Sequence, residues 1–230
     1  MTLPAALVEA VRGCDPGGIA AFDADGTLWR EDVGEAFLRH LVSIGWVKLP
    51  DGRDPYAEYE RQVDEDRRSG YVFAAQLQAG LRVDEVQAEA ERFAREWVPP
   101  RLIPQVNELR ALCDRQRLKT VIVSASPLPI VLAAAKALQI PASHCAGIEV
   151  EAAGGRFTGK AIEPVTYAAG KVAAVESRGW SLPVVACGDS AQGDAALLSA
   201  ARIGVVVAPR CGSPLSAMAP ERGWFVVERD

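Results

Sequence analysis

The sequence lacks the excess of positive charge and the long apolar runs that mark several protein classes. Its 25 Lys and Arg residues face 30 Asp and Glu residues, which gives a net charge of -5. Nucleic acids and anionic membranes need a basic surface, so neither is an expected partner. No apolar run reaches the ~20 residues of a spanning helix, and residues 1–13 lack the cationic flank of a secretory signal. We therefore expect a cytoplasmic protein.

Paired cysteines are also missing. The five cysteines are odd in number, lie far apart and show no spacing typical of zinc sites or disulfide frameworks. We interpret them as reduced and mostly buried small hydrophobic residues.

The chain does contain enough apolar material for a substantial core, since 49% of its 230 residues are hydrophobic. Continuous apolar runs suit strands buried on both faces of a mainly parallel sheet. Four such runs occur, at 18–23, 119–124, 183–188 and 203–208. Helical patterns follow at 104–116, 128–138, 168–178 and 191–201. This alternation predicts a doubly wound, Rossmann-like α/β core.

Residues 30–98 break the alternation and predict a helical cap domain inserted in the core. Val33, Phe37 and Leu41 recur at helical spacing, residues 56–79 form a long charged stretch, and Asp84 precedes Glu85 in the manner of an N-cap. The core is then expected at 1–29 and 99–230. The pair Gly154-Gly155 predicts a small β-hairpin flap on that core.

Asp23 and Asp25 are the first candidate functional residues, because they lie two apart at the end of a predicted strand. Two carboxylates at so short a distance either bind one cation together or take separate roles, one as a nucleophile and the other as an acid/base. Gly26 and Thr27 continue a turn whose amides can face an anion, which makes Thr27 a candidate for substrate binding. Taken alone, the same tetrapeptide also fits an ordinary turn after a strand.

Residues 21–27 match the motif hydrophobic-hydrophobic-Asp-x-Asp-x-Thr, and in this the chain resembles the haloacid dehalogenase superfamily. The resemblance implies that Asp23 is a nucleophile that becomes an aspartyl phosphate and that Asp25 is the acid/base. It also implies a phosphoryl-binding hydroxyl at Ser124, with Ser126 adding a contact. Asp25 argues against dehalogenation, since dehalogenases of this superfamily lack it.

The later motifs of the superfamily are matched by Lys171, which begins a predicted helix, and by Gly188-Asp189 with Asp194 behind it. Lys160 competes with Lys171 for the role of balancing phosphate charge. Mg²⁺ prefers octahedral oxygen ligands, so we expect it to bind Asp23, the Asp25 backbone carbonyl and Asp189, with Asp194 orienting these groups.

The implied activity is Mg²⁺-dependent hydrolysis of a small-molecule phosphomonoester, with a phosphomutase or a noncatalytic phosphate-metabolite-binding module as alternatives. The helical insert after the first motif resembles the phosphoserine-phosphatase branch. That branch places an amino-binding acid near Asp32, with Glu31 beside it. The arginine that would hold a substrate carboxylate has no clear counterpart, the candidates being Arg67, Arg68 and Arg82.

An amino-alcohol phosphate is therefore a second possible substrate, favoured by these acids together with the aromatic side chains of Trp29 and Tyr71. The same aromatic residues also fit a purely structural role, in which they join the cap to the core.

Overall fold

The computed structural model describes residues 3–229. The chain divides into two compact units. The first comprises Met1–Glu31, Arg101–Ser124 and Thr166–Asp230, and the second comprises Asp32–Pro100 and Ala125–Val165. The second unit thus contains residues 125–165 in addition to the helical segment. The functional division into a core and a cap at 30–98 stays a prediction.

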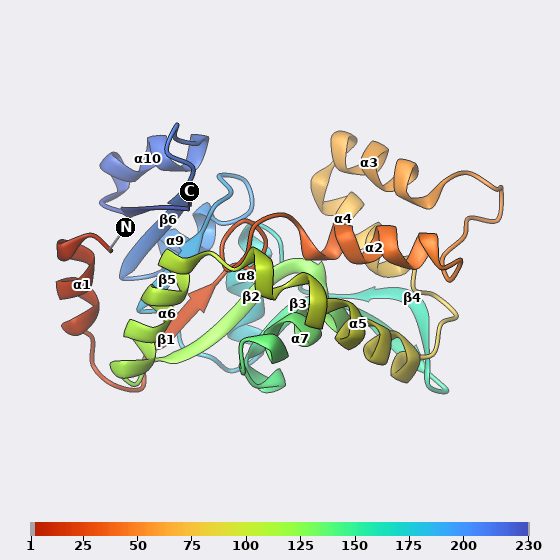
Figure 1. Ribbon diagram of the computed structural model, residues 1–230, viewed down its shortest axis with the longest axis horizontal. Coiled ribbons are helices and arrows are strands. Elements are labelled where there is room, and N and C mark those ends of the chain that lie inside the picture. Colours follow the sequence, from red (N-terminus) through yellow and green to blue (C-terminus); the bar gives the residue numbers. More distant parts are fainter. Residues whose placement is uncertain (1–2, 230) are drawn as a thin grey trace. The chain divides into compact units, whose positions relative to one another are not determined.

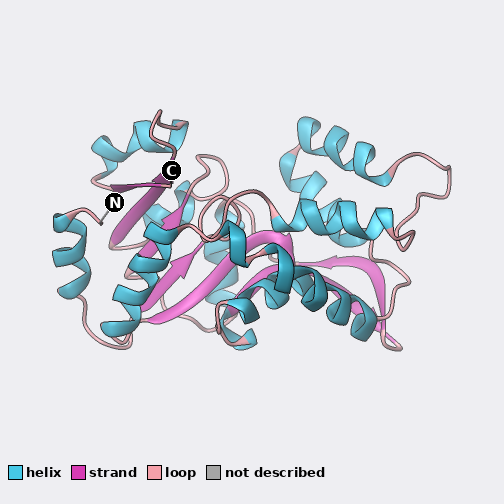
Figure 2. Cartoon of the chain, viewed as in Figure 1, coloured by secondary structure: helices cyan, strands magenta, loops and turns pink. Residues whose placement is uncertain are grey.

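The sheet has seven strands in the order β4-β3-β2-β1-β5-β6-β7. In the first unit, neighbouring strands from β2 to β7 pair in parallel, and β1, β5 and β6 are buried along their whole length. Burial on both faces explains their continuous apolar sequences. The strands of this unit are β1 (Ile19–Phe22), β2 (Lys119–Pro127, ending in the second unit), β5 (Val185–Gly188), β6 (Ile203–Ala208) and β7 (Phe225–Glu228). The expected α/β fold with a mainly parallel sheet is confirmed (Figures 1 and 2).

Helices alternate with these strands in the first unit. They are α1 (Ala5–Arg12), α6 (Pro104–Arg115), α8 (Ala169–Ser177), α9 (Ala195–Ala200) and α10 (Pro214–Arg222). Ser213 caps α10 by accepting a hydrogen bond from the Ser216 amide, and Gly223 ends it in the left-handed region at φ 66°. Helix α9 is shorter than expected, because residues 191–194 form a turn before it.

The second unit contains most of the remaining helices and an antiparallel strand pair. The helices are α2 (Val33–Ser43), α3 (Pro55–Glu65), α4 (Arg67–Gln76), α5 (Val83–Trp97) and α7 (Leu128–Ala137). Strands β3 (Cys145–Ala153) and β4 (Arg156–Ile162) form the expected hairpin, with Gly154 and Gly155 both at positive φ in its turn. Single 3₁₀ turns occur at Pro99–Arg101 and Ala142–His144.

Two sequence expectations for the helical segment are wrong in detail. Residues 56–79 do not form one helix, because Asp66 ends α3 and its side chain caps α4 at the Ser69 amide, 3.0 Å away. Asp84 is not an N-cap, since α5 begins one residue before it. The Val83 amide donates instead to the Gly155 carbonyl of the hairpin turn at 2.9 Å, so a tertiary contact replaces the side-chain cap.

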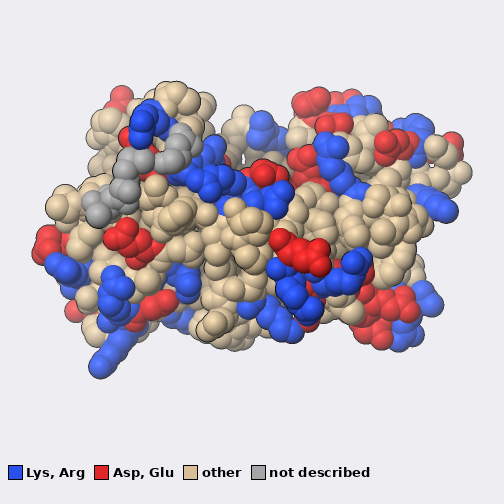
Figure 3. Space-filling model, in the orientation of Figure 1, with Lys and Arg blue, Asp and Glu red and all other residues tan. Residues whose placement is uncertain are grey.

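Among residues 3–229, no helix combines the length and apolar character needed to cross a membrane. On the face drawn in Figure 3, acidic and basic side chains lie side by side. Ion pairs near the surface include Lys136–Glu91 and Lys160–Glu151. Exposed pairs contribute about 0–1 kcal/mol each, so the buried apolar residues carry most of the stability.

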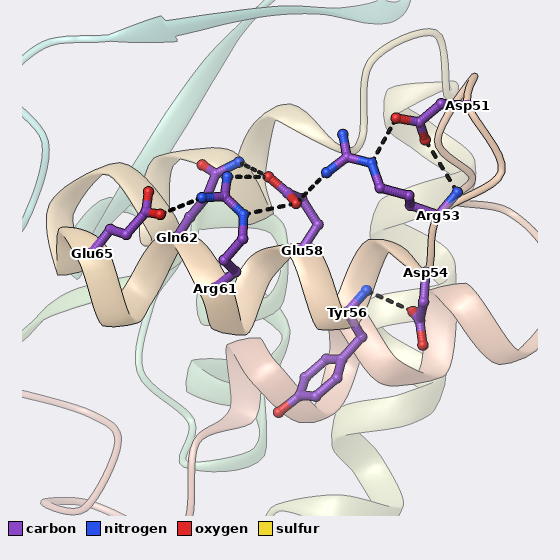
Figure 4. A network of polar contacts seen from close by, with 8 residues as sticks. All are labelled: Asp51, Arg53, Asp54, Tyr56, Glu58, Arg61, Gln62 and Glu65. Carbon is purple, nitrogen blue, oxygen red and sulfur yellow. Dashed lines mark hydrogen bonds and ion pairs between the residues drawn. The ribbon is translucent and has the colours of Figure 1, made fainter.

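One carboxylate of the second unit is held more firmly than these surface pairs. The Glu58 side chain is 8% exposed and accepts hydrogen bonds from Arg61 and Gln62, with Arg53 on its other side (Figure 4). The Arg61 and Gln62 hydrogen bonds, and then the charge of Arg53, lower the pKa of Glu58 from 4.5 to about 2. The network connects the loop before α3 to the helix itself.

This network predicts a pH-dependent contribution to stability. The depressed pKa means that the ionised Glu58 stabilises the fold above pH 4.5 and loses this effect as the pH falls towards 2. We expect Glu58→Gln to lower the melting temperature at neutral pH, and the difference from the wild type to shrink below pH 4.5. Thermal unfolding followed by circular dichroism measures both. Glu65→Gln, which removes a 67% exposed partner of Arg61, is the matched control. A difference that does not change with pH would contradict the assignment.

Candidate functional site

The site forms where two neighbouring parallel strands of the first unit end. Phe22 of β1 pairs with Cys187 of β5, and the Asp23 amide donates to the Cys187 carbonyl at 2.9 Å. Asp23 and Asp189 therefore follow adjacent strands at the same edge of the sheet. In open α/β sheets this edge is where ligands bind. The pairing explains how carboxylates from distant parts of the sequence come together.

Lys171 is the electrostatic centre of the site. It lies in the first turn of α8, is 2% exposed, and donates to Asp23 Oδ1 at 2.5 Å and to Asp194 Oδ1 at 2.6 Å. Burial by itself disfavours the ammonium, but Asp194 and Asp23 together raise the pKa of Lys171 above its usual value. The lysine is therefore charged, and it connects two buried carboxylates.

Asp194 organises the turn that follows β5. Its Oδ2 accepts hydrogen bonds from the amides of Asp189 at 3.0 Å and Ser190 at 2.8 Å, while its Oδ1 accepts from Lys171. A β-carbon on Gly188 would lie 2.5 Å from the Asp194 β-carbon, so this close approach requires glycine. The expectation that Asp194 orients the other groups stays a prediction.

Asp23 is 6% exposed and is held from two sides. Its Oδ2 accepts from the Thr27 hydroxyl at 2.9 Å, and its Oδ1 accepts from Lys171. Burial, followed by the charge of Asp194, raises the pKa of Asp23 well above its usual value, against the opposing effect of Lys171. A further positive charge beside Asp23 would therefore favour its ionised form. Thr27, a candidate for substrate binding, here orients Asp23.

Asp25 lies on the other side of the turn and has its own partners. Trp29 Nε1 donates to Asp25 Oδ1 at 2.8 Å, and the Ser124 hydroxyl donates to Asp25 Oδ2 at 3.4 Å. Ser124 is fully buried, and its backbone carbonyl accepts a hydrogen bond from the Thr166 hydroxyl. Trp29 is also fully buried and thus serves to position Asp25.

Arg229 is a site residue that the sequence analysis missed. Its guanidinium donates to Asp189 Oδ2 and to the Gly26 carbonyl, both at 3.0 Å. Burial and then Asp194 raise the pKa of Asp189 to about 6, and Arg229 acts in the opposite direction. Gly26 is at φ 75°, and a β-carbon there would lie 2.2 Å from Asp189 Oδ2. No local motif marks Arg229, because β7 brings it to the site from the far end of the chain.

The donor set of the site fits a hard divalent cation. One carboxylate oxygen from each of Asp23, Asp189 and Asp194 lies within 4.8 Å of the others. The Lys171 ammonium bonds to two of these carboxylates, Asp23 and Asp194, and the Arg229 guanidinium bonds to the third, Asp189. Oxygen ligands with excess negative charge suit Mg²⁺.

The remaining candidates lie in the second unit. A β-carbon on Gly34 would lie 2.4 Å from Ser126 Oγ and 3.2 Å from Asp32 Oδ1, so Asp32 and Ser126 approach the same residue. Asp32 also caps α2 by accepting a hydrogen bond from the Glu35 amide at 2.8 Å. Lys160 is 72% exposed on β4 and pairs with Glu151, whereas Lys171 is buried among carboxylates.

Two of the three arginine candidates for a substrate carboxylate form exposed ion pairs in the second unit. Arg68 pairs with Glu163 and Arg82 with Asp84, and Arg67 is exposed at the first position of α4.

Fold and site together define an α/β protein with an acidic site at the carboxyl ends of its central strands. The chain belongs to the family of haloacid dehalogenase-like hydrolases, whose pattern matches residues 20–199. No curated protein matches the chain. Among solved structures, it is similar to a protein of unknown function from Bordetella pertussis Tohama I, with a TM-score of 0.80, 23% identity, and coverage of 94% of this chain and 100% of that one.

Two further similar structures have names that refer to phosphoserine. A substrate-bound phosphoserine phosphatase complex has a TM-score of 0.60 and 15% identity, over 94% of this chain and 96% of that one. A phosphoserine phosphohydrolase-like protein from Francisella tularensis subsp. tularensis SCHU S4 has a TM-score of 0.60 and 17% identity, over 91% of this chain and 94% of that one. At these identities the likeness concerns the fold.

The Arg229–Asp189 contact predicts an effect on cation affinity. A divalent cation that uses Asp189 must share it with the Arg229 guanidinium, so Arg229→Gln should bind Mg²⁺ more tightly, by roughly five-fold at this partly exposed position. Titration calorimetry with Mg²⁺ measures the affinity without turnover. Arg222→Gln, the same charge change at an exposed residue of α10, should leave the affinity unchanged. Weaker Mg²⁺ binding in Arg229→Gln would instead assign Arg229 the role of holding Asp189 in place.

Proposed function

We propose that this protein is a Mg²⁺-dependent phosphatase that hydrolyses a small phosphomonoester through an aspartyl-phosphate intermediate. The observation that carries the proposal is the buried Lys171 ammonium, which donates hydrogen bonds to both Asp23 and Asp194. A third carboxylate, Asp25, follows Asp23 by two residues and accepts hydrogen bonds from Trp29 and Ser124. In this proposal Asp23 is the nucleophile, Asp25 carries the proton and Lys171 supplies positive charge. Phosphoryl transfer depends mainly on such positioning and charge balance.

In the proposed first step, a carboxylate oxygen of Asp23 attacks phosphorus, and the bond from phosphorus to the ester oxygen breaks. Asp25 donates its proton to the departing alkoxide, which leaves as the alcohol. The Lys171 ammonium and the Ser124 hydroxyl neutralise and orient the phosphoryl oxygens. Asp23, Asp189 and the Asp25 carbonyl would hold Mg²⁺, which would supply further positive charge to the site.

The second step regenerates the enzyme. Asp25, now a carboxylate, takes a proton from water, whose oxygen attacks the phosphorus of the aspartyl phosphate. The bond between phosphorus and the Asp23 oxygen breaks, inorganic phosphate forms, and Asp25 is protonated again. Trp29 Nε1, 2.8 Å from Asp25 Oδ1, holds this carboxyl in one orientation for both proton transfers.

The helical segment 30–98 is proposed to act as the cap that selects the leaving group and limits access of bulk water. Asp32 and Ser126 are proposed to contact the substrate, because both side chains lie at Gly34 near the beginning of α2. The names of the phosphoserine phosphatase and of the phosphoserine phosphohydrolase-like protein among the similar structures support a phosphomonoester as the substrate class.

Replacement of the nucleophile tests the proposal. Asp23→Asn is nearly isosteric but is a poor nucleophile, so Mg²⁺-dependent hydrolysis of p-nitrophenyl phosphate should fall at least about a thousand-fold. Asp15→Asn, at an exposed residue of the same unit, is the matched control and should retain full activity. Activity of Asp23→Asn above a few per cent of the wild type would contradict the assigned nucleophile. Absence of turnover in the folded wild type with Mg²⁺ would favour the noncatalytic alternative.

A further inference from the structure

Helices α5 and α7 contact each other within the second unit, and most of their buried side chains are small (Figure 1). Ala90 and Ala94 are buried on α5, and Ala133 and Ala134 are buried on α7. Short side chains let two helices approach closely but fill little of the space beside the contact. A cavity of about 320 Å³ opens between the two helices. Its lining residues are Glu91, Arg95, Pro99, Ala133, Lys136 and Ala137.

The lining combines an apolar half with a charged half. The side chains of the proline and the two alanines offer only carbon atoms, whereas the other three side chains are ionic. Pro99, Arg95 and Lys136 are exposed, so solvent and small molecules reach the cavity. None of the lining residues takes part in the proposed phosphoryl transfer.

The one carboxylate of this lining is already engaged. Glu91 Oε2 accepts a hydrogen bond from Lys136 Nζ at 2.7 Å, which joins α5 to α7. Gln87 Nε2 donates to the other carboxylate oxygen at 3.5 Å. The hydrogen bond from Lys136 is the main effect that lowers the pKa of Glu91, and the charge of Arg95 adds to it. Glu91 is therefore ionised at neutral pH.

Arg95 is the cation of the cavity without a partner. Among residues 3–229, none forms an ion pair or a hydrogen bond with its guanidinium. Arg95 follows Glu91 by four residues on α5, a spacing at which these two residue types can pair on one helix. Glu91 instead bonds to Lys136 across the helix contact. The five N–H donors of Arg95 thus remain available at the cavity.

The charge balance of the lining favours a singly charged anion. Two cations and one carboxylate leave one positive charge in excess. A dianion such as phosphate would bring a second negative charge close to Glu91, and this charge would be repelled. The planar fork of a guanidinium matches a carboxylate, which accepts two parallel hydrogen bonds from it. The apolar half of the lining can cover a short hydrocarbon chain.

We infer that this cavity binds a small aliphatic monocarboxylate. Its carboxylate accepts hydrogen bonds from Arg95 and faces Lys136, and its hydrocarbon chain packs on Pro99, Ala133 and Ala137. A volume of about 320 Å³ is at the lower end for ligand cavities and limits the ligand to a few carbon atoms. The inference does not depend on the proposed phosphatase function, because the cavity shares no residue with the proposed phosphoryl-transfer site.

Binding of butyrate tests the site directly. Nuclear magnetic resonance titration of the ¹⁵N-labelled protein at neutral pH compares butyrate with 1-butanol, which lacks the charge, and with inorganic phosphate. We expect butyrate to bind most tightly and to shift the amide signals of the lining residues on α5 and α7. Arg95→Gln should weaken butyrate binding by about 10-fold, because the charged hydrogen-bond donor is lost. Glu91→Gln should tighten butyrate binding by roughly five-fold, because it removes a negative charge and releases Lys136.

Arg115→Gln is the matched control. Arg115, like Arg95, is an exposed arginine in the last turn of a helix, and none of residues 3–229 pairs with its side chain, but it does not line the cavity. The butyrate affinity of this variant should equal that of the wild type. Thermal unfolding confirms that each variant is folded, and we expect little change in Arg95→Gln because Arg95 is exposed and unpaired.

Several results would overturn the inference. Equal butyrate affinity in the wild type and in folded Arg95→Gln would remove Arg95 from the site. Weaker binding in Glu91→Gln would contradict the assigned charge balance. Binding of 1-butanol or phosphate as tightly as butyrate, or no butyrate binding at all, would exclude a carboxylate site in this cavity.

Discussion

The buried ion cluster around Lys171 is the interaction on which the site depends. One ammonium, 2% exposed, bonds to Asp23 and Asp194, and these two carboxylates would otherwise repel each other in a dry environment. Removing one partner of such a pair leaves an uncompensated charge, which typically costs about 3–5 kcal/mol. We therefore expect that Lys171 is needed for folding as well as for the proposed chemistry. Because two carboxylates share a single ammonium here, the cluster retains a negative charge that suits a divalent cation.

Backbone geometry makes this cluster possible. Parallel strands β1 and β5 end side by side, which places Asp23 and the turn after Gly188 within reach of each other. Gly26 and Gly188 admit the neighbouring carboxylates at distances that a β-carbon would block. A glycine also permits a close approach in the second unit. A β-carbon on Gly70 would lie 2.4 Å from Val63 Cγ2, so the close packing of α4 on α3 requires glycine at this position.

Local sequence patterns were sufficient to predict the central strands, most helices and the acidic turns. Buried parallel strands have continuous apolar sequences, and the candidate site residues directly follow these strands. Tertiary contacts decided the rest. Arg229 reaches Asp189 only through the pairing of β7 with β6, and the α5 terminus is satisfied by Gly155 rather than by Asp84. Asp66 both ends α3 and caps α4, a double role that periodicity does not reveal. Tyr71 lines a cavity with Tyr59 that depends on how the helices pack, and its role as a cation contact stays a prediction.

The most direct test of the central claim is chemical trapping of the phosphorylated enzyme. During turnover of a phosphomonoester with Mg²⁺, borohydride reduces an acyl phosphate to an alcohol, and peptide mass spectrometry then locates the modified residue. The account predicts homoserine at position 23 and at no other aspartate. Turnover that continues with Asp23 unmodified, or with the label on another residue, would contradict it.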